Sequence, residues 1–133
     1  MQTNLPLSYF LIIFASDMEQ ACSDIGLREA QHMVDRWITT VGVRYFSPLT
    51  NMAMLAEETG EVARVLARTD GEQSAKPGER LDLADELADL LWVALAIANQ
   101  HGIDMAQAFA NNIVKKNVRD SERHLSNPKL QDN

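Results

Sequence analysis

The segment LADELADLLWVALAIANQ, residues 83–100, most constrains what this chain can fold into. It contains neither proline nor glycine, and Gly102 stands just beyond its end. These features predict a long α-helix, which we place at residues 79–101. Its second half is apolar in almost every direction when wound at about 100° per residue, through Leu90, Leu91, Trp92, Val93, Leu95 and Ile97. A short chain with such a helix is expected to bury it at the centre of a bundle or against a second subunit.

Three further helices are expected on either side of this one. The first covers residues 24–41 and ends at Gly42, and the second follows the segment YFSPLT and continues to residue 68. Ser47 or Thr50 is available as the capping residue, and Pro48 is tolerated in a first helical turn.

The fourth helix starts after Asp104 as N-cap and continues to about residue 123. No window shows strand alternation joined by a hairpin turn. The expected fold class is therefore all-α, a four-helix bundle completed by dimerisation, with pairing of dimers into a tetramer as an alternative.

The length of 133 residues fits one domain, which we place at 21–126 between an N-terminal extension, 1–20, and a tail, 127–133. The run LPLSYFLIIFA in the extension is about half of the ~20 apolar residues that a membrane span needs, and no basic residue precedes it. We expect it to pack on the domain or at a subunit interface. Alternatively, Met18 is the natural start.

Charge and cysteine content narrow the classes of partner. Acidic residues outnumber basic ones by 19 to 12, for a net charge of −7, which disfavours DNA or RNA because phosphate binding depends on Lys and Arg. A divalent metal can still reverse the local sign for a small phosphorylated ligand. The single cysteine, Cys22, cannot form an internal disulfide. We therefore expect a reducing, cytoplasmic location. Cys22 lies in the N-terminal segment and is expected to be inert, and no membrane partner is expected.

The second helix carries acidic residues on its apolar side. In LAEETGEVARVLAR, residues 55–68, Glu58 falls in the middle of the apolar stripe, with Glu61 on its margin and Glu57 just beyond. The stripe is formed by Met54, Leu55, Val62, Val65 and Leu66. A carboxylate in that position approaches the interior.

The third helix repeats this arrangement. Its acidic residues recur at i, i+3, i+4 and i+7 and share one face, as Asp82, Asp85, Glu86 and Asp89. Further along the helix, the same face carries Val93, Ala96 and Ile97. The acidic residues therefore lie on a face that is expected to pack in the apolar core. Both acidic sets are thus expected on buried stripes.

Carboxylates brought together in this way need a cation. Two like charges about 4 Å apart repel by roughly 4 kcal/mol at an effective dielectric constant of 20. Arg64 and Arg68 lie on the Glu57 and Glu61 flank, away from Glu58, so a divalent ion such as Mg²⁺ is the better counter-charge. The alternative interpretation is a solvated acidic face without a metal.

The two acidic motifs, EETGE and ELAD in an all-α chain, resemble those of the MazG-like nucleotide pyrophosphohydrolases of the all-α NTP pyrophosphatase superfamily. The resemblance covers residues 31–124, including YFSPLTNMAMLAEETGEVAR and KKNVRDSER. It implies Mg²⁺-dependent hydrolysis, with Mn²⁺ as an alternative ion, of a nucleoside triphosphate to the monophosphate and pyrophosphate. House-cleaning of non-standard nucleotides is one expected role.

The resemblance also implies roles for particular residues. The metal ligands would be Glu58, Glu61, Glu86 and Asp89, and Glu57, Glu58 and Glu61 would form the catalytic group, with Glu57 supporting the ligands or helping to activate water. A basic run on the fourth helix would contact the triphosphate, through Lys115, Lys116, Asn117, Arg119 and Arg123. The alternative for that run is a solvated helix end.

Aromatic residues ahead of the second helix are candidates for holding a base. Trp37, Tyr45 and Phe46 could each stack on a nucleobase, because every base has a π face. Core packing is the alternative, and it is favoured for Trp37 by its register with Val34 and Ile38. Trp92 is either core or the floor of the pocket.

Three rival functions fit parts of the pattern. A phosphoribosyl-ATP pyrophosphohydrolase uses a related pair of acidic helices, although the YFSPL segment favours the MazG-like branch. A di-iron carboxylate bundle needs two ExxH motifs, and this chain offers one, from Glu29 to His32. A non-enzymatic helical interaction module would not be stabilised by Mg²⁺ or nucleotide.

Overall fold

The structure, a computed structural model, describes residues 25–130. Its elements are α2 (Leu27–Thr40), α3 (Pro48–Thr69), α4 (Leu83–Gln100), α5 (Met105–Leu125) and the 3₁₀ turn η1 (Pro128–Leu130). No strand occurs within this range, so the all-α prediction is confirmed. The N-terminal extension, Met18 and Cys22 lie outside the described residues, as do the last three residues of the tail.

Capping side chains set the starts of α3 and α5 where the sequence predicts them. The Ser47 hydroxyl accepts a hydrogen bond from the Thr50 N–H at 3.1 Å, with Pro48 in the first turn. Asp104 accepts from the Gln107 N–H at 3.1 Å. Beyond the end of α4, Gly102 adopts a φ of 63°, a conformation that glycine reaches without a Cβ penalty.

The predicted start of the helix at 79–101 is wrong by four residues. Asp82 is the N-cap of α4 and accepts from the Asp85 N–H at 3.2 Å. Ahead of it, the Glu79 carboxylate accepts from the Lys76 N–H at 2.9 Å and belongs to the loop. A side chain that satisfies nearby backbone N–H groups competes with helix formation, which delays the helix until Leu83.

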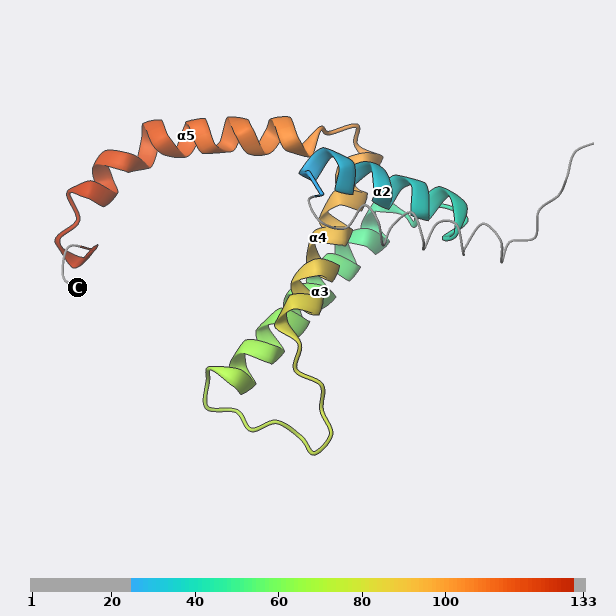
Figure 1. Ribbon diagram of the computed structural model, residues 1–133, viewed down its shortest axis with the longest axis horizontal. Helices are drawn as coiled ribbons and strands as arrows, with labels where there is room; N and C mark the ends of the chain where they lie inside the picture. Colours follow the sequence, from blue (N-terminus) through green and yellow to red (C-terminus); the bar gives the residue numbers. More distant parts are fainter. Residues whose placement is uncertain (1–24, 131–133) are drawn as a thin grey trace, which may run out of the picture.

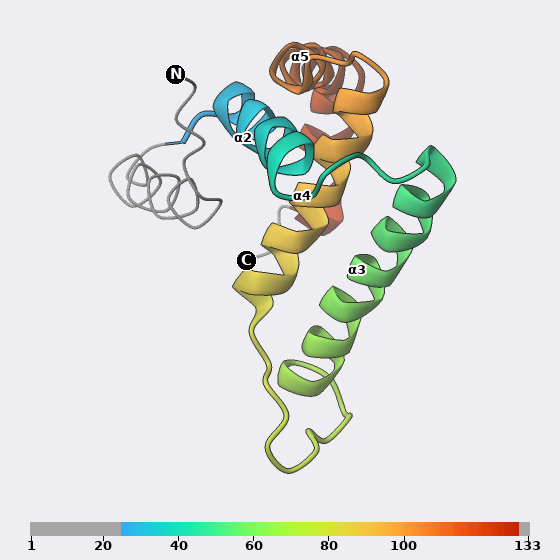
Figure 2. The same cartoon turned by 90° about the vertical axis from the view of Figure 1, so that its right-hand side faces the viewer.

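The α3 and α4 helices run antiparallel, side by side, and are joined by the loop at the end of the molecule opposite α2 (Figures 1 and 2). The α2 helix lies across the C-terminal half of α4. The core between them is formed by Val34, Ile38, Leu95 and Ala96. This packing leaves the N-terminal half of α4 facing α3 alone, which is where the acidic residues are placed.

Gln31 of α2 joins three helices. Its amide nitrogen donates to the side-chain oxygen of Asn99 at 2.9 Å and to the Ile103 carbonyl at 2.6 Å. Its oxygen accepts from the Met105 N–H at 3.0 Å, where α5 begins. Because Gln31 is buried and its amide is satisfied on both sides, it fixes the end of α4 and the start of α5 against α2.

Parts of the apolar surface have no cover within residues 25–130. The helix α5 extends away from the α3–α4 pair (Figure 1), and its Phe109 and Ile113 side chains are exposed. On α4, Leu95 is buried but Leu87 and Leu91 are 47% and 46% exposed. The predicted central helix, apolar on almost every side, is thus only partly covered by the other described residues. None of the helices in the described range is long and apolar enough to cross a membrane.

Candidate metal and nucleotide site

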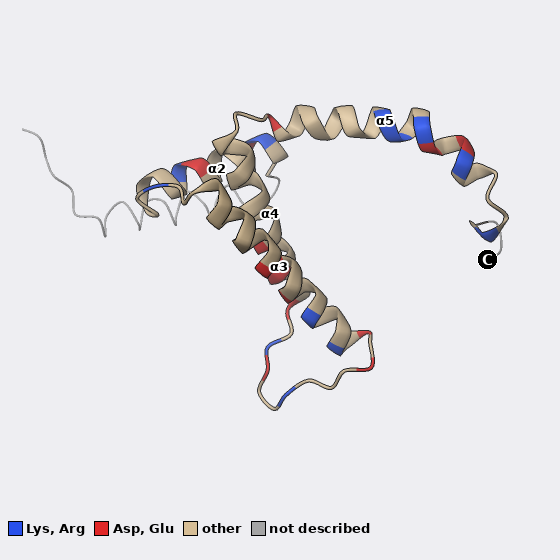
Figure 3. Ribbon diagram, turned by 180° about the vertical axis from the view of Figure 1, so that it is seen from behind, with Lys and Arg blue, Asp and Glu red and all other residues tan. Residues whose placement is uncertain are grey.

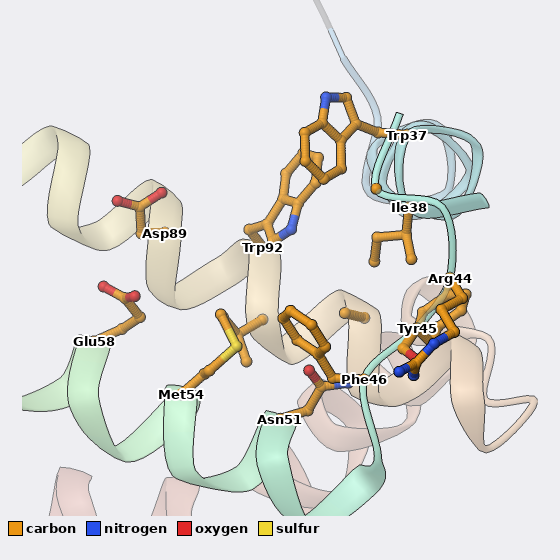
Figure 4. Close-up of a pocket in the computed structure, with 13 residues that line it drawn as sticks. Trp37, Ile38, Arg44, Tyr45, Phe46, Asn51, Met54, Glu58, Asp89 and Trp92 are labelled. Atoms are coloured by element: carbon orange, nitrogen blue, oxygen red, sulfur yellow. The ribbon is translucent and has the colours of Figure 1, made fainter. Parts of the chain in front are cut away.

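Three carboxylates meet where α3 faces the first turns of α4. Glu58 comes from α3, and Glu86 and Asp89 come from successive turns of α4; one oxygen from each lies within 4.8 Å of the others. Figure 4 shows the Glu58 and Asp89 side chains at the same end of the pocket, one on each of the two helices. We call these three residues the acidic cluster, and it is the one group of this kind among residues 25–130.

The environment of Glu58 disfavours its charged form. Partial burial raises the pKa of the Glu58 carboxyl, and the negative charges of Asp89, Glu57, Glu86 and Glu61 raise it further. Within residues 25–130 no basic side chain forms an ion pair with Glu58 or Asp89. An all-carboxylate donor set in which two of the three members have no basic partner fits a hard divalent cation such as Mg²⁺.

The flank of the acidic cluster is held by arginine. Arg64 of α3 binds the Glu61 carboxylate one turn earlier, Glu79 of the loop at 2.9 Å, and Glu86 at 3.0 Å. Arg68 reaches Glu79 at 3.2 Å. The Lys76 N–H, followed by Arg64 and Arg68, holds the pKa of Glu79 below its usual range. The loop is therefore tied to the cluster through Arg64.

These contacts separate the predicted metal ligands into two groups. Glu58, Glu86 and Asp89 come together, whereas Glu61 lies outside the acidic cluster, paired with Arg64. Glu57 is exposed beside the cluster and forms no ion pair within residues 25–130. Glu86 is shared, because it belongs to the cluster and also accepts from Arg64.

The first two acids of the α4 series do not join the cluster. Asp82 caps the helix and pairs with Arg80 at 3.0 Å, and Asp85 pairs with the same arginine at 3.3 Å. The expectation of four acids on one interior-facing patch is correct for Glu86 and Asp89 but wrong for these two. The later helix start explains this for Asp82, which lies at the cap of α4 rather than on its face. Asp85 lies in the first turn of α4, exposed and paired with Arg80.

A cavity of about 510 Å³ opens beside the cluster. Glu58 and Asp89 stand at one end of it, and Met54, Trp92 and Phe46 line its apolar walls (Figure 4). A site with mostly apolar walls and a few polar groups is typical of small-molecule binding. The cavity thus places an apolar compartment next to carboxylates that can hold a cation.

The three predicted aromatic residues all line this cavity. Trp37 stacks edge-on against Trp92, with ring centroids 5.4 Å apart and planes at 84°, and is still 38% exposed. Trp92 therefore supports the core and the cavity wall at once. The Tyr45 hydroxyl donates to Asp35 at 2.6 Å, and burial together with this bond raises the pKa of Tyr45 to about 12.

The chain approaches the cavity through a strained linker. Val43, between α2 and α3, has a φ of 70°, which is unusual for a β-branched residue. This turn is followed directly by Arg44, Tyr45 and Phe46, which line the cavity. Strain held at such a position is commonly associated with a functional site.

The basic run of α5 is not brought to the acidic cluster within one chain. Its lysines and arginines lie in the outer half of α5, away from the α3–α4 pair (Figure 3). Arg119 pairs with the neighbouring Asp120 at 2.7 Å, and Arg123 pairs with the same carboxylate at 3.2 Å. Lys115, Lys116 and Asn117 are exposed on this outer half. Within residues 25–130 of one chain, the basic run therefore lies apart from the acidic cluster.

Several site residues could not be singled out from the sequence. Asn51 and Met54 precede Glu58 by two turns and one turn on the same side of α3, and this spacing was the available signal. Arg44 and Glu79 carry no such signal, since loop packing alone decides where they point. The lone ExxH pair, Glu29 and His32, forms no acidic or metal-ligating group with other described residues.

Comparison with known proteins agrees with this geometry. The model of the MazG nucleotide pyrophosphohydrolase domain matches residues 46–124, which include the acidic cluster, the linker end and most of α5. The YpjD protein of Bacillus subtilis (strain 168) is 37% identical over 102 residues, covering 76% of this chain and 92% of that protein.

Similarity extends to a solved structure. The crystal structure of YPJD from Bacillus subtilis superposes with a TM-score of 0.64 at 38% identity, over 74% of this chain and 99% of that one. The family match, the sequence identity and the structural similarity therefore agree, and the chain belongs to the MazG nucleotide pyrophosphohydrolase family.

Proposed function

We propose that this protein hydrolyses nucleoside triphosphates to nucleoside monophosphate and pyrophosphate in the presence of Mg²⁺ or Mn²⁺. One observation carries the proposal: three carboxylates from two helices form the acidic cluster, and two of them, Glu58 and Asp89, line an apolar cavity of about 510 Å³. The cluster suits a metal-bound phosphate chain, and the cavity suits a nucleoside. Family membership supports the same reaction class.

In this proposal Glu58, Glu86 and Asp89 hold the divalent ion. When bound, it would lower the pKa of a nearby water and screen the phosphate charge. Glu57, exposed beside the cluster, would accept the proton of the attacking water. The water oxygen forms a bond to the α-phosphorus as the bond from that phosphorus to the bridging oxygen breaks, and pyrophosphate leaves with the bridging oxygen.

Glu61 and Arg64 would act at the edge of this site. Arg64 already orients Glu61 and Glu86 through charge-assisted hydrogen bonds. Its position next to a cluster member would place a fixed positive charge near the phosphates of the substrate. The walls contributed by Trp37, Tyr45 and Phe46 would hold the base by stacking and exclude water from it.

We further propose a homodimer, or a tetramer built from dimers. Leu87 and Leu91 on α4 and Phe109 and Ile113 on α5 are exposed in one chain. A second copy would bury these side chains, as obligate interfaces bury apolar surface. The same association would allow the basic run of one α5 to approach the acidic cluster of another copy.

Pyrophosphate release from a panel of nucleoside triphosphates tests the reaction. The wild-type protein should release pyrophosphate with Mg²⁺ and none with EDTA, and Glu58→Gln or Asp89→Asn should abolish release. Glu29→Gln is the matched control, because it makes the same charge change on an exposed part of α2. Full activity in both cluster variants would refute the proposed role of the carboxylates.

Mixing two inactive variants tests whether a second copy contributes α5. If Arg119→Ala and Glu58→Gln are each inactive, chains refolded together should regain part of the activity, since some mixed dimers pair an intact cluster with an intact α5. Co-refolded chains that stay as inactive as the separate variants would show that both residues must act within one chain.

A further inference from the structure

The floor of the cavity contains a buried polar side chain, Asn51, that the proposed reaction does not use. Asn51 lies on α3 two turns before Glu58 and is 5% exposed. In Figure 4 its side-chain oxygen points into the cavity, between Phe46 and Met54. A buried amide in an apolar wall is costly unless its hydrogen-bonding groups find partners, so its orientation carries information about the ligand.

The chain itself fixes that orientation. The Phe46 carbonyl can only accept a hydrogen bond, and it accepts one from the amide nitrogen of Gln100 at 2.6 Å. Gln100 must therefore turn its oxygen toward Asn51, which donates from Nδ2 to that oxygen at 2.7 Å. The Asn51 oxygen is left facing the cavity as an acceptor, and no donor within residues 25–130 bonds to it.

The distance along α3 indicates which part of a nucleotide would meet this acceptor. Seven residues of helix separate Asn51 from Glu58, a rise of about 10 Å. With the phosphates at the acidic cluster, the base occupies the apolar compartment and its edge farthest from the sugar reaches Asn51. On that edge cytosine and adenine carry an amino group, whereas uracil, guanine and hypoxanthine carry a carbonyl oxygen.

We propose that the cavity selects nucleotides whose base carries an amino group on this edge over their keto counterparts. Asn51 is the specificity-determining residue, since its oxygen accepts from the amino group and repels a carbonyl. Gln100 is a positioning residue that prevents the Asn51 amide from rotating. This inference rests on the proposed function, because it uses the acidic cluster to place the phosphates.

Two matched substrate pairs test the selection, each differing by one amino-to-keto exchange. CTP should be hydrolysed with a kcat/KM about ten- to a hundredfold above that of UTP, the penalty of an acceptor facing an acceptor. ATP and inosine triphosphate form the second pair and show whether the cavity admits purines. Selection in either pair supports the proposal, and equal kcat/KM values within both pairs would overturn it.

Two variants separate recognition from simple packing. Asn51→Ala removes the acceptor, and Gln100→Leu leaves Asn51 free to turn its nitrogen toward the cavity. Each should bring the CTP to UTP ratio toward one, and the second should do so mainly by improving UTP. Gln73→Leu, an exposed loop position, is the control for the glutamine exchange and should keep the wild-type ratio. A ratio unchanged in Gln100→Leu would overturn the assignment even if Asn51→Ala failed to fold.

Binding measured without turnover separates this inference from the proposed function. The probes are CTP and UTP analogues with a methylene group in place of the α,β-bridging oxygen, titrated calorimetrically with Mg²⁺. Tighter binding of the CTP analogue, with no hydrolysis of any triphosphate, would support the base selection and refute the proposed reaction. Hydrolysis of CTP and UTP at equal rates, with equal binding of the two analogues, would support the proposed reaction and refute the base selection. If neither analogue bound, both proposals would be overturned.

Discussion

Neutralising Glu58 should stabilise the metal-free protein. Glu58→Gln removes a negative charge whose oxygen lies within 4.8 Å of oxygens of Glu86 and Asp89. Each repulsion at about 5 Å is worth roughly 3 kcal/mol at a dielectric constant of 20 and below 1 kcal/mol in water. Because Asp89 is exposed and Glu58 is only partly buried, solvent screening favours the lower end.

A net gain of about 1 kcal/mol would raise Tm by roughly 3–6 °C for a chain of this size. The assay is thermal unfolding in EDTA and again in Mg²⁺. Wild type should gain stability with the ion, by about 2.7 kcal/mol at a hundred times Kd, and Glu58→Gln should lose most of this gain. Glu29→Gln, with the same charge change on α2, should behave as wild type.

The opposite result would refute this reasoning. If Glu58→Gln lowered Tm in EDTA by several degrees and kept the full Mg²⁺ response, Glu58 would be a structural hydrogen-bonding residue rather than a repelled carboxylate. Glu86→Gln provides an internal comparison, because its carboxylate also accepts from Arg64 at 3.0 Å. It should gain less stability than Glu58→Gln, or lose some.

Three further outcomes follow from the contacts. Arg64→Gln breaks ion pairs to three carboxylates and should lower Tm in EDTA clearly more than Arg80→Gln, whose side chain is 74% exposed; equal effects would contradict the bridging role. The Gln107 N–H, with help from Arg28, holds the pKa of Asp104 below its usual range. The stabilisation that ionised Asp104 gives the fold is therefore full above the ordinary carboxyl pKa and is lost as pH falls through the lowered value. In urea unfolding, Asp104→Ala should differ in stability from wild type at pH 7 and converge with it in acid. Leu91→Asp should convert the proposed dimer to single chains in light scattering, and a wild-type protein with the mass of one chain at micromolar concentration would refute the dimer.

The sequence predicted most reliably what local chemistry decides. Ser47 and Asp104 cap their helices because their side chains satisfy backbone N–H groups a few residues ahead, and this signal is visible in one dimension. The register of Glu58 with the apolar stripe of α3, and of Glu86 with Asp89 on α4, follows from helical geometry alone.

Contacts that depend on how elements pack could not be predicted in this way. Helical register predicts Arg64 on the flank of α3, but its bond to Glu86 depends on the relative height of α3 and α4, which no local pattern encodes. The same holds for Asn51, whose orientation is decided by Gln100 at the far end of α4. The direction of α5 depends on Gln31 and on the turn after α4, so no local pattern predicts the separation of the basic run from the cluster.

The position of bond cleavage tests the central claim most directly. Phosphorus NMR of a nucleoside triphosphate incubated with the protein and Mg²⁺ should show the monophosphate and pyrophosphate in equal amounts, with no diphosphate intermediate. Neither product should form with Glu58→Gln. Release of orthophosphate with nucleoside diphosphate, or Mg²⁺-dependent turnover that survives Glu58→Gln, would contradict the account.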